Sequence, residues 1–120
     1  VLHFLTGTEI EQSVRNMSRW LCSGGRVYLI ADTPYNRFLK SFLPIYEERK
    51  HRGDFWPGQI DNFPQFMPTE LAPNLPNFFH TLDPDILARV CTQMGLIVER
   101  KGFISRIDYL PDAQELRIKK

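Results

Sequence analysis

The sequence has little of what metal sites and disulfide frameworks require. Its 120 residues include only two cysteines and three histidines, and the histidines lie far from one another and from the cysteines along the chain. No metal-ligand spacing results, so we expect no metal site. Cys22 and Cys91 lie in apolar, helix-like contexts. This pattern predicts two buried, reduced thiols of a cytoplasmic protein.

The chain also lacks a long hydrophobic run and an excess of either charge. It has no stretch of about 18 apolar residues, the length that a membrane span needs, and no secretory signal is visible. Fifteen basic residues against fourteen acidic ones create no overall attraction to nucleic acid. We therefore expect no membrane span, and a small-molecule substrate rather than nucleic acid.

A helix followed by a short apolar strand opens the chain. Thr6 and Thr8 each precede a glutamate by three residues, which is the spacing of a capping box. Apolar residues then recur at helical spacing and form one stripe: Ile10, Val14, Met17 and Leu21, widened by Trp20. We expect Gly24 and Gly25 to end this helix. Residues 27–31 are apolar without alternation, which predicts a strand buried on both faces in a parallel sheet.

The residues after this strand are candidates for a site by position alone. In open α/β sheets, ligands bind outside the carboxyl ends of the strands. The residues at that point here are Asp32, Thr33, Pro34 and Tyr35. The sequence thus predicts a binding edge where the strand turns.

Residues 35–80 form an aromatic and proline-rich excursion. A helix is expected over residues 35–52, interrupted at Pro44, with Phe38, Phe42, Ile45 and Tyr46 on one face. The segment is too aromatic for a disordered linker and too long for an idle loop. Two interpretations stay open: an ordered excursion that packs its own aromatics onto the domain, or a lid that closes over a ligand beside Asp32.

A second helix and a second strand follow the excursion. Asp83 before Pro84 is typical of a capped helix start. The expected buried stripe is Leu87, Val90, Cys91 and Met94, and Gly95 is expected to end the helix. Residues 96–98 then open a strand that runs towards Ile107, and residues 115–119 are a further, short candidate strand.

Three segments together carry a family resemblance: residues 2–5 (LHFL), residues 20–27 (WLCSGGRV) and residues 94–99 (MGLIVE). They resemble the C-terminal half of a class I S-adenosylmethionine-dependent methyltransferase. In that family an LHH- or LHF-like segment follows the fourth strand. A helix ending in L-x-P-G-G precedes the fifth strand, and a helix ending in A/M-G-F/L precedes the sixth.

The chain departs from the family pattern in three places. The family's glycine-rich loop and the acidic residue that ends its second strand are absent from these 120 residues. Cys22 and Ser23 stand where a basic residue and proline are common, and the last antiparallel strand is missing or reduced to residues 116–118. We therefore expect a fragment of a longer enzyme, beginning near the end of the fourth strand.

The resemblance implies an α/β fold with a partial Rossmann-like methyltransferase sheet, in the order helix, strand, insert, helix, strand. Residues 1–120 would be the C-terminal part of the methyltransferase domain, with residues 35–80 as its insert. The implied activity is S-adenosylmethionine-dependent methyl transfer to an unidentified acceptor. The chain alone is expected to be inactive, because half of the cofactor site is missing.

The resemblance also implies roles for individual residues. Those expected to bind the cofactor are Val1, Leu2, His3 and Phe4. Those expected to face the substrate are Asp32, Pro34 and Tyr35, with Phe38 and Trp56 of the aromatic insert. Asp32 or His3 could serve as a general base. Each also has an ordinary structural interpretation, because a carboxylate at a strand end often caps the next segment and a histidine often packs in a core.

Other classes of function remain open. The chain could be a non-catalytic α/β interaction module that binds a protein or peptide through its aromatic insert. It could also be another nucleotide-binding enzyme, such as a doubly wound dehydrogenase, although an antiparallel ending suits a methyltransferase better. In a fragment, the strand at residues 27–31 would have exposed edges, so we expect the isolated chain to dimerise, exchange elements or aggregate.

Overall fold

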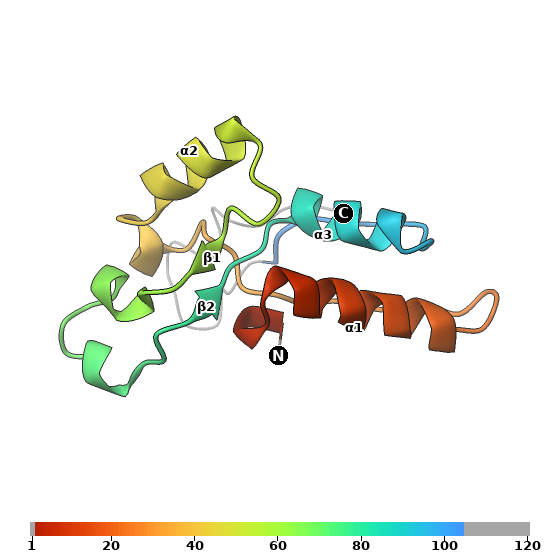
Figure 1. The fold of residues 1–120 in the computed structure, drawn as a ribbon, viewed down its shortest axis with the longest axis horizontal. Coiled ribbons are helices and arrows are strands. Elements are labelled where there is room, and N and C mark those ends of the chain that lie inside the picture. The colour runs from red at the N-terminus through yellow and green to blue at the C-terminus, as the bar shows by residue number, and fades with distance from the viewer. Residues whose placement is uncertain (1, 105–120) are drawn as a thin grey trace.

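Three α-helices and one small sheet form the part of the chain that the structure, a computed structural model, describes: residues 2–104 (Figure 1). The helices are α1 (Gly7–Trp20), α2 (Leu43–Arg52) and α3 (Pro84–Gln93), and the strands are β1 (Gln59–Ile60) and β2 (Phe79–His80). Short 3-10 turns cover Leu2–Phe4, Arg37–Leu39, Phe63–Phe66 and Ala72–Asn74. The mixed α/β class predicted from the sequence is confirmed at this coarse level.

Helix α1 begins as predicted and ends earlier than predicted. The Thr6 N–H donates to Glu9 Oε1 at 2.9 Å, and the Glu9 N–H donates to Thr6 Oγ1 at 3.3 Å, so the capping box is formed. The helix stops at Trp20, and Gly24, with φ of 85°, lies in the turn that follows rather than at the cap. Trp20 is 76% exposed, so its predicted place in the buried stripe is wrong.

The two ends of helix α3 form as its sequence predicts, but of the predicted buried stripe only Val90 is fully buried, and Leu87, Cys91 and Met94 are half-buried. The Asp83 carboxylate caps it by accepting from the Ile86 N–H at 2.8 Å, and Pro84 occupies the first turn. Gly95 has φ of 87° just after the helix end, a conformation that glycine adopts without steric cost. Local signals therefore fixed both ends of this helix.

Helices α1 and α3 lie side by side and share one hydrophobic cluster (Figure 1). Its buried members, here called the helical core, are Leu2, Ile10, Val14, Leu82, Ile86 and Val90. Ser18 of α1 donates to the Met94 carbonyl at 2.8 Å and ties the far ends of the two helices together. Leu29 and Ala31 of the segment at residues 27–31 pack against the same cluster.

The segment at residues 27–31 is extended, but its other face is open. Val27, Leu29 and Ala31 are half-buried, whereas Tyr28 is 84% and Ile30 is 75% exposed. The predicted burial on both faces is therefore wrong, because among the described residues only the helical core covers the segment, and it covers one side. Nor do the described residues form the predicted parallel sheet, since their one sheet is antiparallel.

The second predicted strand behaves in the same way. Residues 96–104 are not in a strand within the described part of the chain, and Ile97 is 90% exposed. Arg26 contacts Glu99 at 2.9 Å, and the Tyr35 ring meets the Phe103 ring at 5.7 Å. These two contacts place the extended segments near each other and running in the same direction. The rest of this predicted strand, and the candidate strand at residues 115–119, lie outside the described residues.

The insert at residues 35–80 has its own core and contains the sheet. Its buried cluster, here called the insert core, is Leu39, Phe42, Tyr46, Ile60 and Phe63. Strand β1 pairs antiparallel with β2, matching Gln59 with His80 and Ile60 with Phe79. Arg49 of α2 donates to the Gln59 carbonyl at 2.6 Å and holds the helix against β1.

The predicted long helix over residues 35–52 is wrong in its extent. Helix α2 begins only at Leu43, which puts Pro44 in the first turn, where a missing N–H costs nothing, instead of in a kinked interior. Of the four residues predicted to share one face, Phe42 and Tyr46 are buried, Ile45 is half-buried and Phe38 is exposed.

Three further predictions concern membrane spans, metals and thiols. No helix within the described range is long and apolar enough to cross a membrane. Over the same residues, no group of three or more histidine, cysteine, aspartate or glutamate side chains could hold a metal ion. Both cysteines are free, but Cys22 is exposed, which corrects its predicted burial, because the helix ends before reaching it.

Candidate functional site

The structure brings together the two residues that the sequence singled out for chemistry. His3 Nδ1 lies 3.1 Å from Asp32 Oδ2, and the two side chains are 27% and 39% exposed. The pair is thus anchored in the protein and open to solvent at the same time. Here it is called the dyad.

Backbone contacts position both members of the dyad. His3 lies in the Leu2–Phe4 turn, which is closed by the Leu5 N–H donating to the Leu2 carbonyl at 3.1 Å, with Leu2 buried in the helical core. The Asp32 carbonyl accepts from the Leu82 N–H at 2.7 Å. Since Leu82 directly precedes the cap of α3, the loop that carries Asp32 is tied to the start of that helix.

Two aromatic rings contact the histidine. The His3 ring centroid lies 4.1 Å from that of Phe4 and 5.2 Å from that of Phe79. Phe79 in turn stacks on Phe63 of the insert core, with centroids 4.3 Å apart and planes 10° apart. The dyad therefore lies where the insert meets the N-terminal turn, beside aromatic faces from both.

This arrangement can hold a proton acceptor in a fixed orientation. A carboxylate beside Nδ1 favours the tautomer that carries its proton there, which leaves Nε2 with a lone pair. Among the described residues, no hydrogen bond to the Nε2 atom of His3 occurs. Chemically, the dyad has the form of a general base with an orienting carboxylate.

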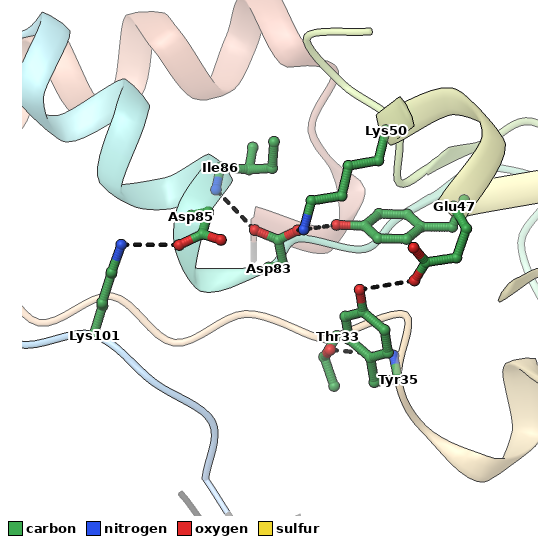
Figure 2. A network of polar contacts seen from close by, with 9 residues as sticks. Thr33, Tyr35, Glu47, Lys50, Asp83, Asp85, Ile86 and Lys101 are labelled. Atoms are coloured by element: carbon green, nitrogen blue, oxygen red, sulfur yellow. Dashed lines mark hydrogen bonds and ion pairs between the residues drawn. The ribbon is translucent and has the colours of Figure 1, made fainter. Parts of the chain in front are cut away.

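A buried polar network lies behind the dyad loop, and Figure 2 shows how its side chains converge on Asp83. The Tyr46 hydroxyl of α2 donates to Asp83 Oδ2, and Lys50 Nζ lies 3.0 Å from the same oxygen. The Ile86 N–H donates to the other carboxylate oxygen. The network joins α2 of the insert to the start of α3.

The charges of this network are set by opposing effects. Burial raises the pKa of Asp83, but hydrogen bonds from Tyr46, the Ile86 N–H and Lys50 outweigh burial and hold that pKa below its ordinary value. Burial and the neighbouring Asp83 carboxylate raise the pKa of the Tyr46 hydroxyl far above its usual range. Asp83 is therefore ionised and Tyr46 neutral at pH 7.

Tyr35 attaches the dyad loop to the same helix (Figure 2). Its hydroxyl donates to Glu47 Oε1 at 3.0 Å, and its ring meets Tyr46 edge-on at 5.7 Å. Its backbone N–H donates to Thr33 Oγ1 at 3.2 Å, which closes the turn after Asp32. Burial and the Glu47 contact raise the pKa of Tyr35, so it also stays neutral.

The remaining histidine of interest, His80, is fully buried. Its Nδ1 lies 2.8 Å from the Leu5 carbonyl, its Nε2 has no partner, and the Trp56 ring meets it edge-on at 5.5 Å. Burial lowers the pKa of His80, with the Leu5 carbonyl opposing that effect. A Cβ atom at Gly7 would collide with the Trp56 ring, so this packing requires glycine there.

The predicted cofactor residues fall in different environments. His3 and Phe4 lie at the dyad, and Phe4 is 56% exposed. Leu2 is buried in the helical core, and Val1 lies outside the described residues. His3 and Phe4 are thus the members of this group with side chains that a ligand could reach.

The predicted substrate residues are not all at the dyad. Pro34 is buried and Tyr35 is half-buried against α2. Trp56 packs against His80 and Arg89, and Arg37 lies over the exposed Phe38 ring. Of the described rings, Phe4 and Phe79 contact His3.

Sequence reasoning missed Phe79, Tyr46 and Lys50 as supports of this region. Tyr46 and Lys50 are four residues apart on α2, so they share a helix face that could have indicated a common partner. Phe79 carried no such signal, because its contact with His3 depends on the pairing of β1 with β2.

A comparison of the chain with known protein families, with curated proteins and with solved structures gives no match.

Proposed function

We propose that this chain is the C-terminal part of a longer S-adenosylmethionine-dependent methyltransferase and that the dyad lies at its reaction site. The extended segments at residues 27–31 and 96–104 would be strands of a Rossmann-like sheet that the rest of the enzyme completes. The methyl acceptor is a small molecule.

One observation supports this proposal most. Asp32 follows the extended segment at residues 27–31, His3 lies in the segment that resembles the one after the family's fourth strand, and the two side chains lie 3.1 Å apart. Ligands of open α/β folds bind at the carboxyl ends of strands. The convergence of two such ends, each carrying a group able to move a proton, is what a reaction site at this edge requires.

The residues at the dyad suit a positively charged cofactor. When bound, S-adenosylmethionine supplies an electrophilic methyl group on a sulfonium centre. The exposed face of Phe4 can attract such a cation, and the Asp32 carboxylate adds negative charge nearby. Phe4 and the backbone of the Leu2–Phe4 turn would hold it, with buried Leu2 fixing the turn from below.

The exposed outer face of the extended segments supports a longer enzyme. Tyr28, Ile30 and Ile97 are large apolar residues that face solvent in the described part of the chain. In a sheet with helices on both faces, such residues lie under a second helical layer. The proposal assigns that layer to the rest of the enzyme.

Calorimetric titration of S-adenosylmethionine into the longer protein tests the proposal. We expect saturable binding, and we expect Phe4→Leu to weaken it about 2- to 5-fold, the size of a half-exposed cation–π contact. Phe55→Leu is the matched control, because Phe55 is also an exposed phenylalanine but lies beside Arg89, away from the dyad. Absence of binding by the unmodified longer protein would overturn the proposal.

A second candidate function has one observation in its favour. The insert folds around its own core yet exposes Phe38, Phe55 and Leu71. These residues could anchor a protein or peptide to a non-catalytic interaction module. Saturable peptide binding that Phe38→Ser abolishes, together with no response to S-adenosylmethionine, would favour this candidate over the methyltransferase.

A further inference from the structure

We propose that the methyl acceptor is a phenol and that His3 Nε2 takes its proton while Asp32 positions the imidazole. This inference rests on the proposed methyltransferase function and adds the chemical class of the acceptor. It is carried by the dyad geometry and by the two phenylalanine rings that contact His3.

The orientation of His3 indicates which acceptors would benefit from a base. Asp32 Oδ2 lies 3.1 Å from Nδ1, so the proton of neutral His3 is held on that atom and the lone pair is on Nε2. A positioned base helps only an acceptor that loses a proton when it is methylated, such as a hydroxyl, thiol or amine. Carbon acceptors without an acidic proton and thioethers gain nothing from it.

The acidity of the acceptor favours a phenol over an aliphatic alcohol or an aliphatic amine. An imidazole titrates at about 6.5, a phenol at about 10 and an ammonium at about 10.4. Proton transfer from a phenol to an imidazole is therefore uphill by a few pKa units, which a positioned base can overcome, whereas an aliphatic alcohol is far less acidic. An aliphatic amine is protonated at pH 7 and has no lone pair to attack with.

The side chains around His3 also favour a flat, uncharged acceptor. Phe4 and Phe79 provide aromatic faces next to His3 and meet each other edge-on, with centroids 6.4 Å apart, and stacked Phe63 supports Phe79 from behind. A flat aromatic ring packs well against such faces. The charged group against His3 is Asp32, and its carboxylate disfavours anionic acceptors such as benzoates.

The reaction then balances as follows. The phenol oxygen forms a bond to the methyl carbon of S-adenosylmethionine, and the sulfur–carbon bond breaks with its electron pair retained by sulfur. The phenolic proton passes to Nε2 and later leaves to solvent. The products are an aryl methyl ether, S-adenosylhomocysteine and one proton.

The test compares probes and variants of the longer protein. The main probe is 4-methylphenol. Four further compounds, each offered alone as an alternative acceptor, test the assigned class: 4-methylbenzyl alcohol, 4-methylbenzoate, 4-methylthiophenol and 4-methylaniline. Methyl transfer to the phenol is expected to rise with pH along a limb that His3→Gln removes, with a loss of about 100-fold or more in kcat. Asp32→Asn should lower kcat about 10-fold with little change in KM.

A second readout does not depend on turnover. NMR signals of the His3 ring should shift when 4-methylphenol is added to the unmodified protein, and Phe79→Leu should weaken that binding. His51→Gln is the control, because His51 is exposed on α2 and lies outside the dyad. It should leave kcat, the pH limb and probe binding unchanged.

The possible negative results separate three errors: in the role of His3, in the acceptor class and in the proposed function itself. If S-adenosylmethionine binds and His3→Gln changes phenol methylation less than 2-fold, the assignment of His3 is wrong while the proposed function stands. If the thiophenol, aniline, benzoate or alcohol is methylated and the phenol is not, the acceptor class is wrong. If S-adenosylmethionine does not bind, both proposals fall together.

Discussion

The insert and the helical layer bury their apolar residues to different extents. In the insert, Phe42, Tyr46 and Ile60 are almost completely buried, and the two strands pair with each other. In the helical layer, α1 and α3 cover one side of the extended segments, while Tyr28, Ile30 and Ile97 face solvent. Both regions have a buried core, but among the described residues the extended segments of the helical layer are covered on one side, whereas the strands of the insert pair with each other.

The largest effect should come from the insert core. Phe42→Ala removes a buried ring that packs against Tyr46 and Phe66, so it should lower the free energy of unfolding by about 3–5 kcal/mol. Chemical denaturation measures this loss. The exposed Phe55→Ala should cost far less, and equal losses at the two positions would contradict a self-sufficient insert core.

The next effect concerns the network that joins the two regions. Asp83→Ala removes the α3 cap and leaves Tyr46 and Lys50 without their shared partner, so it should cost about 2–3 kcal/mol. Asp85→Ala is the matched control, because Asp85 is an exposed acid in the same helical turn, paired with Lys101 at the surface. It should cost at most about 1 kcal/mol. Equal costs in thermal or chemical unfolding would show that the Asp83 network does not join the regions.

A smaller, pH-dependent effect should arise from His80. Because burial lowers its folded pKa, the unfolded chain binds the proton more readily. Its stabilising contribution is therefore complete above the unfolded value of about 6.5 and is lost as pH falls towards the folded pKa, by at most about 1.4 kcal/mol per pH unit. Unfolding measured between pH 8 and pH 5 should show this loss. His80→Gln should remove it, and His51→Gln should retain it.

The smallest effect on folding should come from the open face of the helical layer. Ile97→Thr changes a side chain that is already in solvent, so the free energy of unfolding should change by about 0.5 kcal/mol or less. Self-association of the isolated chain should nevertheless weaken, because exposed apolar patches and unpaired edges drive it. Light scattering at high concentration measures this, and a monomeric unmodified chain would contradict the expectation.

Local features of the fold could be predicted from the sequence, whereas those that depend on distant partners could not. The Thr6 capping box and the Asp83–Pro84 helix start each need only a few neighbouring residues, and both formed as predicted. Burial of Tyr28 and Ile30 depends on a second covering layer, so an apolar run alone could not establish it.

The candidate site follows the same division. His3 and Asp32 were each named from their position in the chain, but their approach to 3.1 Å depends on the Leu82 contact that holds the Asp32 loop. The convergence of Tyr46 and Lys50 on Asp83 depends on where α2 lies relative to the start of α3. No spacing in the sequence encodes that packing directly.

Titration of S-adenosylmethionine into the isolated chain and into the longer protein, under identical conditions, tests the central claim most directly. We expect binding heat with the longer protein and none with the isolated chain, because the dyad and Phe4 provide only part of the cofactor site. Absence of heat with both proteins would contradict the account, and attention would turn to the insert as a surface that binds a partner.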